Sequence, residues 1–335
     1  MEVFEVFTIA GTGEKGDKNG PGNEATFYHP QGIDIRADGT IIIADGRIHK
    51  IRGIDLDGNV YTIARTGESG DKDGPGNEAT FNYPVGIVVR NDGTIIVSDM
   101  YNRKIRGIDL NGNVFTIAGT GVIGDKDGPG NEATFYHPQG IAVRNDGTII
   151  VADTGNCKIK GIDLDGNVYT IAGTGEVGDK DGLGNEAIFY YPRGIAVQND
   201  GTIIIADTYN HKIKGIDPDG NVFTIAGTGE VGDKDGPGNE AMFNYPHGIA
   251  VRNDGTIIVS DTANHKIRGI DPDGKVYTIA GTGKIGDKDG PGNEASFNDP
   301  HGIAIRVDGT IIVSDTLNSK IRGIRTKKLV KSAIE

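Results

Sequence analysis

The sequence predicts an all-β protein that folds as a single six-bladed β-propeller with four antiparallel strands in each blade. A unit of 54 residues recurs six times without a slip in register, as the equally spaced prolines Pro30, Pro84, Pro138, Pro192, Pro246 and Pro300 show. Each unit contains four short runs rich in Val, Ile and Thr, separated by Gly-containing polar segments. Tandem units that each hold four short strands are typical of propeller blades.

One unit, read from Gly140 onward, shows the expected elements of a blade. The turns Asp146-Gly147 and Asp165-Gly166 join consecutive strands as hairpins, because Gly adopts the positive φ that such turns require. The four strands are expected at residues 140–144, 148–152, 158–162 and 168–172, with a long connection to the next blade at 173–192. The units starting at Gly194 and Gly248 share 43 of 54 residues, so all six blades are expected to be alike.

The two ends of the chain predict how the ring closes. The sixth unit supplies three strands, at residues 302–306, 310–314 and 320–324, and lacks the fourth. Residues 6–10 match the fourth strand of the second unit, 114–118. We expect the N-terminal strand to complete blade six, which would remove two exposed strand edges. The propeller domain then covers residues 1–324, and residues 325–335 form a basic C-terminal tail.

Composition and charge argue against several classes of protein. The net charge of −13 disfavours binding of a nucleic-acid phosphate backbone. No apolar run approaches the roughly 20 residues of a membrane span, and residues 1–6 do not resemble a signal peptide. The only cysteine, Cys157, has no partner for an internal disulfide. We therefore expect a soluble, cytoplasmic monomer that binds neither nucleic acid nor membrane.

The segment after the second strand resembles the NHL repeat, which is named for an Asn-His-Leu-like triplet at that place. Two units carry it as Asn210-His211-Lys212 and Asn264-His265-Lys266, one residue after the segments 206–208 and 260–262. The resemblance covers residues 6–324 and implies a six-bladed propeller whose first strands line a central channel. Propellers of this kind serve as protein- and peptide-binding platforms, kinase sensor domains and RNA-binding modules, and a few related ones are metal-dependent lyases or lactonases.

Differences between the units concentrate on one face, around the expected channel mouth. They are found in the connections from the fourth strand to the next first strand and from the second strand to the third. Because Tyr, His and Arg are common in binding surfaces, we predict that this face binds a protein, peptide or glycan without catalysis. Neutral variation at exposed sites would give the same pattern. The predicted binding residues are His29, Gln31, Tyr83, Tyr101, His137, Gln139, Tyr191, Arg193, Tyr209, Tyr245, His247 and His301.

The alternative function is that of a metal-dependent hydrolase or lyase at the channel mouth. His247 and His301 occupy the same position in adjacent blades, and Asp34 is the one carboxylate expected on a channel strand. The mouth position offers no third histidine for zinc. The acidic segment 71–78 has only part of the ligand alternation of a calcium loop, and turn formation explains its residues as well. We therefore predict no catalytic residue, no cofactor and no metal site.

Overall fold

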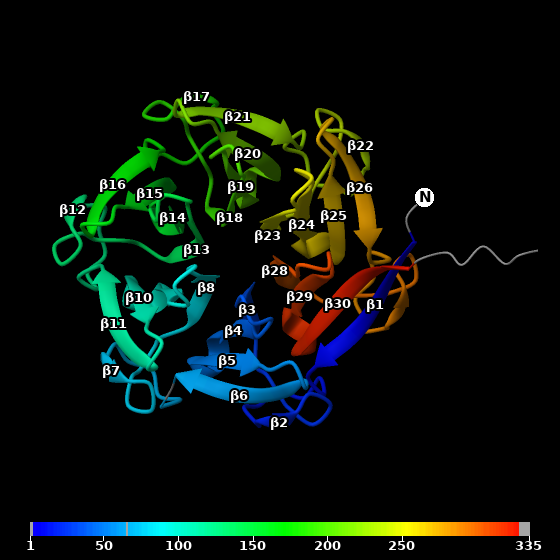
Figure 1. The fold of residues 1–335 in the computed structure, drawn as a ribbon. Coiled ribbons are helices and arrows are strands. Elements are labelled where there is room, and N and C mark those ends of the chain that lie inside the picture. The colour runs from blue at the N-terminus through cyan, green and yellow to red at the C-terminus, as the bar shows by residue number, and fades with distance from the viewer. Residues whose placement is uncertain (1–2, 65, 328–335) are drawn as a thin grey trace, which may run out of the picture.

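The structure, a computed structural model that describes residues 3–64 and 66–327, is a ring of six β-sheets around a central axis (Figure 1). Each sheet is antiparallel and radiates outward like a propeller blade, as the sequence predicts. The repeat therefore forms one closed six-bladed β-propeller.

Four strands per blade follow the predicted order from the channel outward. The innermost strands are β3 (Pro30–Ile35), β8 (Pro84–Val89), β13 (Pro138–Val143), β18 (Pro192–Val197), β23 (Pro246–Val251) and β28 (Pro300–Ile305). The second strands are β4 (Ile41–Asp45), β9 (Ile95–Asp99), β14 (Ile149–Asp153), β19 (Ile203–Asp207), β24 (Ile257–Asp261) and β29 (Ile311–Asp315). The third strands are β5 (Lys50–Ile54), β10 (Lys104–Ile108), β15 (Lys158–Ile162), β20 (Lys212–Ile216), β25 (Lys266–Ile270) and β30 (Lys320–Lys327). The fourth strands are β6 (Asn59–Ala64), β11 (Asn113–Ala118), β16 (Asn167–Ala172), β21 (Asn221–Ala226), β26 (Lys275–Ala280) and, for blade six, β1 (Val3–Ala10).

Each blade also has a short fifth strand that the sequence pattern did not predict. It comes from the connection that enters the blade and pairs with the outermost strand, which covers the edge of the sheet. The fifth strands are β2 (Gly20–Pro21), β7 (Gly74–Pro75), β12 (Gly128–Pro129), β17 (Gly182–Leu183), β22 (Gly236–Pro237) and β27 (Gly290–Pro291). Two residues are too few to show the alternation of apolar and polar residues by which strands are recognised.

A single 3₁₀ turn connects the second strand of each blade to the third. These turns are η1 (Gly46–Ile48), η2 (Met100–Asn102), η3 (Thr154–Asn156), η4 (Thr208–Asn210), η5 (Thr262–Asn264) and η6 (Thr316–Asn318). They lie at the same end of the blades as the connections that enter the innermost strands, and we call this side the mouth face. The turns between the first and second strands of every blade, and between the third and fourth strands of blades one to five, lie on the opposite side, the turn face.

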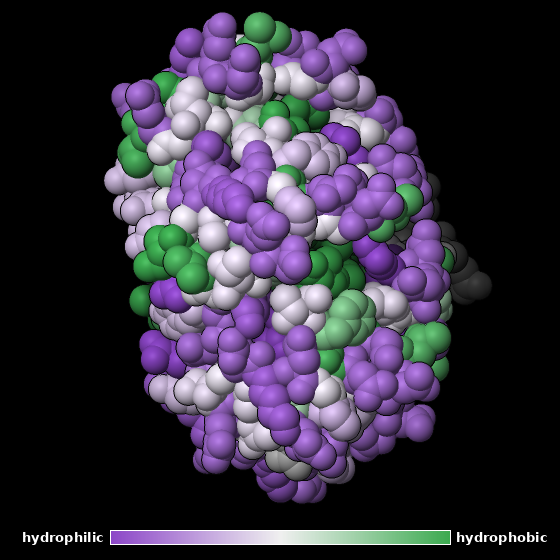
Figure 2. All heavy atoms as spheres, turned by 90° about the vertical axis from the view of Figure 1, so that its left-hand side faces the viewer, coloured by the Kyte–Doolittle hydropathy of each residue, from purple (hydrophilic) through white to green (hydrophobic). Residues whose placement is uncertain are grey.

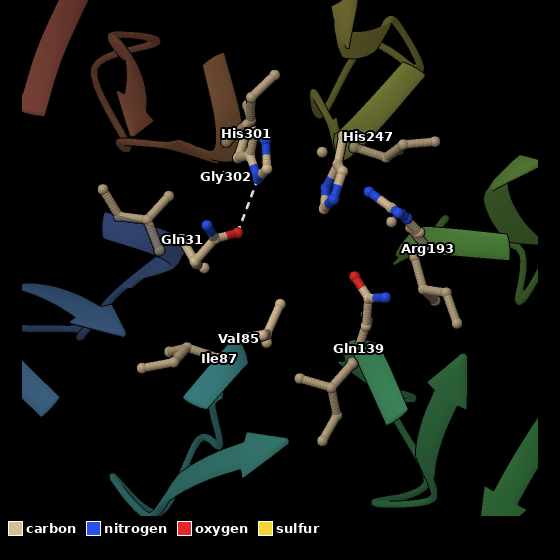
Figure 3. A pocket seen from close by; sticks show the side chains of 18 residues that line it. Gln31, Val85, Ile87, Gln139, Arg193, His247, His301 and Gly302 are labelled. Atoms are coloured by element: carbon tan, nitrogen blue, oxygen red, sulfur yellow. Dashed lines mark hydrogen bonds between the residues drawn. The ribbon is translucent and has the colours of Figure 1, made fainter. Parts of the chain in front are cut away.

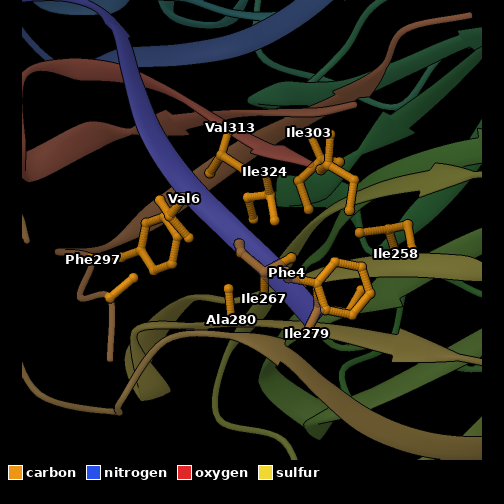
Figure 4. Packing of buried hydrophobic residues seen from close by; sticks show 12 residues of the cluster. Phe4, Val6, Ile258, Ile267, Ile279, Ala280, Phe297, Ile303, Val313 and Ile324 are labelled. Atoms are coloured by element: carbon orange, nitrogen blue, oxygen red, sulfur yellow. The ribbon is translucent and has the colours of Figure 1, made fainter. Parts of the chain in front are cut away.

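The N-terminal strand closes the ring as predicted. Strand β1 pairs antiparallel with β30 over its length, with Val6 opposite Ile324. Phe4 and Val6 are buried among residues of blades five and six (Figure 4). Strand β30 continues through Lys327, so the first three residues of the predicted tail belong to the sheet, and Arg325 lies 2.8 Å from Glu5. The rest of the predicted tail, residues 328–335, lies outside the described residues.

The hydrophobic core consists of six similar clusters, each between two adjacent blades. The rim of the ring over β11, β12 and β16 is mostly hydrophilic, with hydrophobic side chains in small separate groups (Figure 2). No helical segment of the described chain is long and apolar enough to cross a membrane.

Candidate binding face

The mouth of the channel is formed by one side chain from each blade. The residue after each strand-initial proline points toward the axis, and the six residues are Gln31, Val85, Gln139, Arg193, His247 and His301 (Figure 3). The space that they and the next two residues of each strand line measures about 70 Å³. Pockets that hold a whole small-molecule ligand measure roughly 300–1,000 Å³, so this space is small for such a ligand.

Backbone contacts between neighbouring blades explain why the mouth is so narrow. A Cβ atom on Gly140 would lie 1.8 Å from the carbonyl oxygen of Arg193, and one on Gly194 would lie 1.8 Å from that of His247. Only glycine permits this approach of one innermost strand to the next. The channel therefore admits at most a small group from the mouth face.

The two histidines at the mouth form a neutral stacked pair. The rings of His247 and His301 are stacked with centroids 4.1 Å apart, and His301 Nδ1 lies 2.7 Å from Gln31 Oε1 (Figure 3). Burial, with a smaller contribution from the charge of Arg193, lowers the pKa of His301 to about 3. Burial also holds the pKa of His247 well below its usual value. Both imidazoles are therefore uncharged at neutral pH.

Arg193 is the only cation among these six mouth residues. Its guanidinium carbon lies 5.6 Å from the ring centre of Tyr209. Its Nε is buried and, within the described part of the chain, has no hydrogen-bond acceptor. The guanidinium is thus oriented by an aromatic ring and retains donors for a ligand.

Aromatic rings on the mouth face form two groups of contacting rings, one at blades two and three and one at blades four and five. We call the two groups together the aromatic crescent: Tyr83, Tyr101, Tyr136 and His137 in the first group, and Tyr190, Tyr191, Tyr209, His211 and Tyr245 in the second. Neighbouring ring centroids within it lie 4.5–5.6 Å apart. Tyr101 and Tyr245 expose 44% and 39% of their surface. The equivalent sites in blade six carry Asp299 and Leu317, so the crescent covers only part of the ring.

The backbone before each strand-initial proline is left-handed, contrary to the extended geometry expected for a residue that precedes proline. The six residues are His29, Tyr83, His137, Tyr191, Tyr245 and Asp299, with φ between 47° and 59°. In three blades a histidine of the preceding blade accepts the amide hydrogen of this residue, as His211 Nδ1 does for Tyr245 at 3.1 Å. The histidine of the NHL-like triplet therefore helps to hold a mouth-face aromatic residue in position.

The Asn of the same triplet has a structural role that the sequence did not reveal. Asn210 Nδ2 donates to Asp207 Oδ2 and to the carbonyl of Gly178, both within its own blade. Asp207 Oδ1 accepts the amide hydrogen of Tyr190 at 2.8 Å. The strand-terminal aspartate thus bonds to the loop of its own blade. The fully buried carboxylate also pairs with Lys214 at 3.5 Å.

Asp34 lies between two innermost strands. Its Oδ1 accepts from the amide of Ile35, and its Oδ2 accepts from the amide of Val89 on β8 of the next blade. Burial raises the pKa of Asp34 to about 6. The carboxyl group is thus hydrogen-bonded to backbone amides of two blades, and it bridges blades one and two.

The residues present do not fit a resident zinc or calcium ion. Among residues 3–64 and 66–327 no three His, Cys, Asp or Glu side chains are placed to share an ion. Face-to-face stacking of His247 and His301 keeps their nitrogens from converging on one point between them. In the acidic segment 71–78, Asp71, Asp73 and Glu78 are ion-paired with Lys104, Arg106 and Lys72. We therefore derive no catalytic step through a metal.

The fold and the mouth face define the class of protein: a six-bladed β-propeller with a narrow channel and a polar, aromatic face. The NHL repeat family matches residues 135–162, 189–216 and 243–270. NHL repeat-containing protein 2 from Gallus gallus is 32% identical over 314 residues, which cover 82% of this chain and 43% of that protein. Protein SUPPRESSOR OF QUENCHING 1, chloroplastic, from Arabidopsis thaliana is 32% identical over 285 residues, covering 79% of this chain and 27% of that protein. The chain belongs to the NHL repeat family.

The chain spans less than half the length of these two relatives. The relative from Arabidopsis thaliana is named as a chloroplastic protein, so the cytoplasmic location of this chain stays a prediction.

Solved structures show the same fold in proteins of different function. An auxiliary nutrient binding protein from Bacteroides thetaiotaomicron superposes with a TM-score of 0.75 at 17% identity, covering 97% of this chain and 77% of that one. A streptogramin B lyase superposes with a TM-score of 0.59 at 15% identity, covering 97% of this chain and 98% of that one. Since both identities are low, these likenesses concern the fold alone.

Proposed function

We propose that the protein is a non-catalytic binding scaffold whose mouth face binds a protein, peptide or glycan. The observation that carries the proposal is the aromatic crescent, because clustered and partly exposed Tyr side chains offer large contact area at a low cost in side-chain entropy. Arg193, with buried Nε and no protein acceptor, supplies a cation beside Tyr209 for a carboxylate or another polar group of the ligand.

The asymmetry of the crescent supports the same proposal. Six near-identical blades would place identical groups around the axis, but the ring contacts differ between blades. The crescent lies in blades two to five, blade one has only Tyr28 against His29, and the imidazole pair joins blades five and six. A surface that differs around the ring can orient an asymmetric partner. The narrow cavity behind the mouth also suits surface docking better than enclosure of a substrate.

The test compares capture of partners by the intact protein and by a variant of the crescent. Tyr101→Ala/Tyr209→Ala removes two rings at a position where blade five has Ala263, so the fold should tolerate it. The control is Tyr61→Ala/Tyr169→Ala, which removes two exposed rings from outermost strands. We expect partners captured by the intact protein and the control to be lost with the crescent variant. Equal capture by all three proteins would refute the mouth-face proposal.

A metal-dependent hydrolase or lyase is the alternative that the sequence suggested. Metal analysis of the purified protein distinguishes it from the binding scaffold: stoichiometric zinc or calcium that His247→Val removes would favour the enzyme. Val occupies the same mouth position in blade two, so this variant should keep the fold.

A further inference from the structure

The turn face carries a second group of residues that repeats around the axis. The residue directly after each innermost strand is arginine in five blades and glutamine in one. We call Arg36, Arg90, Arg144, Arg252 and Arg306 the arginine ring, and Gln198 is the sixth member of the set. All six side chains are half-buried.

The arginine ring differs from the buried cations of the third strands in having no ion-pair partner. On the third strands, Arg106, Arg268, Lys160 and Lys214 each contact two or more aspartates within 4.0 Å. For the five ring arginines, by contrast, no carboxylate oxygen of the described residues lies within that distance. The Nε atoms of all five are buried without a protein acceptor. Five unpaired guanidinium groups are unusual in a chain whose net charge is −13.

The carboxylates closest in sequence to the ring arginines are engaged in their own turns. Each ring arginine is followed two residues later by an aspartate whose Oδ1 accepts an amide hydrogen, as Asp92 accepts that of Thr94 at 2.9 Å. Backbone hydrogen bonds are the first cause of the lowered pKa of Asp92, and the charge of Arg90 contributes less. The turn aspartates therefore balance the ring charges only at longer range.

Three of the ring arginines, Arg144, Arg252 and Arg306, line clefts between neighbouring blades, and turn aspartates line the same clefts. Arg252 and Arg306 share a cleft of about 390 Å³, and Arg252 and Gln198 share another of about 450 Å³. A third cleft of about 300 Å³ lies between Arg144 and Gln198. Arg90 Nη2 donates to the carbonyl of Gly147 at 3.3 Å, so its side chain extends from blade two to blade three. The guanidinium groups thus face shared spaces in which one ligand can contact two blades.

We propose that the arginine ring is a binding site for a multiply charged oxyanion, a small molecule with two or more phosphate or carboxylate groups. Guanidinium groups donate pairs of hydrogen bonds that match the oxygens of both groups. Several like charges around one axis also favour a ligand with several negative groups over a single small anion. This site lies on the face opposite the aromatic crescent and does not depend on the function proposed for that face.

Titration calorimetry of the intact protein tests the proposal, with tripolyphosphate and citrate as probes and inorganic phosphate for comparison. The variant Arg90→Gln/Arg252→Gln/Arg306→Gln copies the residue of blade four, so it should fold. The control Lys72→Gln/Lys126→Gln/Lys234→Gln removes three exposed cations elsewhere. We expect the intact protein and the control to bind tripolyphosphate or citrate more tightly than phosphate. The ring variant should lose about tenfold or more in affinity for each arginine removed.

A gain in affinity makes the test independent of folding defects. Gln198→Arg completes the ring and should tighten binding of the preferred probe several-fold, with a matching rise in Tm in its presence. Preference for tripolyphosphate or for citrate assigns the phosphate or the carboxylate class. Absence of binding by the intact protein, equal losses in the ring variant and the control, or binding of single-stranded RNA with none of the small probes would each overturn the proposal.

Discussion

The imidazole of His247 stacks on that of His301, with ring centroids 4.1 Å and ring planes 23° apart. Burial and the nearby positive charge of Arg193 both disfavour protonation of either ring. The stacked pair is therefore most stable when both rings are neutral. Gln31 Oε1 completes the arrangement as the partner of His301 Nδ1. The pair joins blades five, six and one at the mouth, where the sixth blade meets the first.

This pairing predicts a pH-dependent cost to stability. The folded-state pKa of His301 is about 3, whereas an unfolded histidine titrates near its usual 6.5. Below that value the unfolded chain binds a proton that the folded chain does not, so stability falls as the pH drops from about 6.5 toward 3. In His301→Gln, which copies blades one and three, this loss is absent. We compare the free energy of unfolding of His301→Gln with that of the parent at each pH. The difference, variant minus parent, should be about 1–2 kcal/mol larger at pH 4.5 than at pH 7.5.

Urea unfolding at the two pH values measures this difference. His265→Gln serves as the control, because His265 lies on the third-strand side of η5 and is not in the stacked pair. An unchanged difference between His301→Gln and the parent across this range would show that His301 is protonated in the folded protein.

Asp34 predicts a pH effect of the opposite sign. Its folded-state pKa of about 6 lies above the ordinary value of 3.8, so the folded chain holds a proton that the unfolded chain has released. Stability contributed by this group is present at low pH and is lost as the pH rises through about 6. Asp34→Ala introduces the residue that blades three to six have at this position. Its free energy of unfolding minus that of the parent should be about 1–2 kcal/mol larger at pH 7.5 than at pH 4.

Chemical unfolding of Asp34→Ala and the parent across that range gives the measurement. Ala142→Gly, a change at the same position of blade three, controls for side-chain volume without a titratable group. If the difference between Asp34→Ala and the parent did not vary with pH, Asp34 would be ionised in the folded protein.

Local signals in the sequence were sufficient for the blades and for ring closure. Asp-Gly turns and runs of β-branched residues determine hairpins over a few residues, and the similarity of residues 6–10 to 114–118 identified the strand that completes blade six. Contacts between blades could not be predicted in this way. Gln31 and His301 are 270 positions apart, and their hydrogen bond exists only because the ring closes. The left-handed backbone at Tyr191 was also missed, because the restriction before proline was taken to outweigh the surrounding hydrogen bonds.

The candidate sites show a similar division. Variation between units located the mouth face, but it could not show that Tyr101 contacts His137 of the next blade or that Tyr209 contacts Tyr245 of the next blade. The arginine ring is visible in the sequence as a repeated arginine, yet its significance rests on the absence of close carboxylates in the described structure. Arg268, on the third strand of blade five, has two close carboxylates, those of Asp235 and Asp261.

Those buried ion pairs predict a large difference between two substitutions of Arg268. Its Nη1 donates to the fully buried carboxylate of Asp261 at 2.7 Å, and its Nη2 donates to Asp235. Arg268→Ala leaves Asp261 without its cation, which should cost about 3–5 kcal/mol of unfolding free energy. Arg268→Lys copies Lys160 and Lys214, which form the same kind of pair in blades three and four, and should cost less than about 1.5 kcal/mol. Urea unfolding compares the two, and similar losses would show that the guanidinium geometry is essential in blade five.

Closure by β1 predicts that the N-terminal strand stabilises the whole ring. Val6 is 1% exposed and packs in the cluster between blades five and six, while β1 also pairs with β27 and β30 (Figure 4). Val6→Asp places a carboxylate in this cluster and should lower the free energy of unfolding by more than about 3 kcal/mol. The control Glu5→Gln, on the same strand, removes only surface ion pairs, with Arg325 and Lys327, and should leave Tm nearly unchanged. Scanning calorimetry distinguishes cooperative closure from local docking. If the Val6→Asp variant unfolds in one cooperative transition at a much lower Tm, the strand stabilises the whole ring. A small early transition followed by the main transition at the parent Tm would mean that the other five blades are stable without β1.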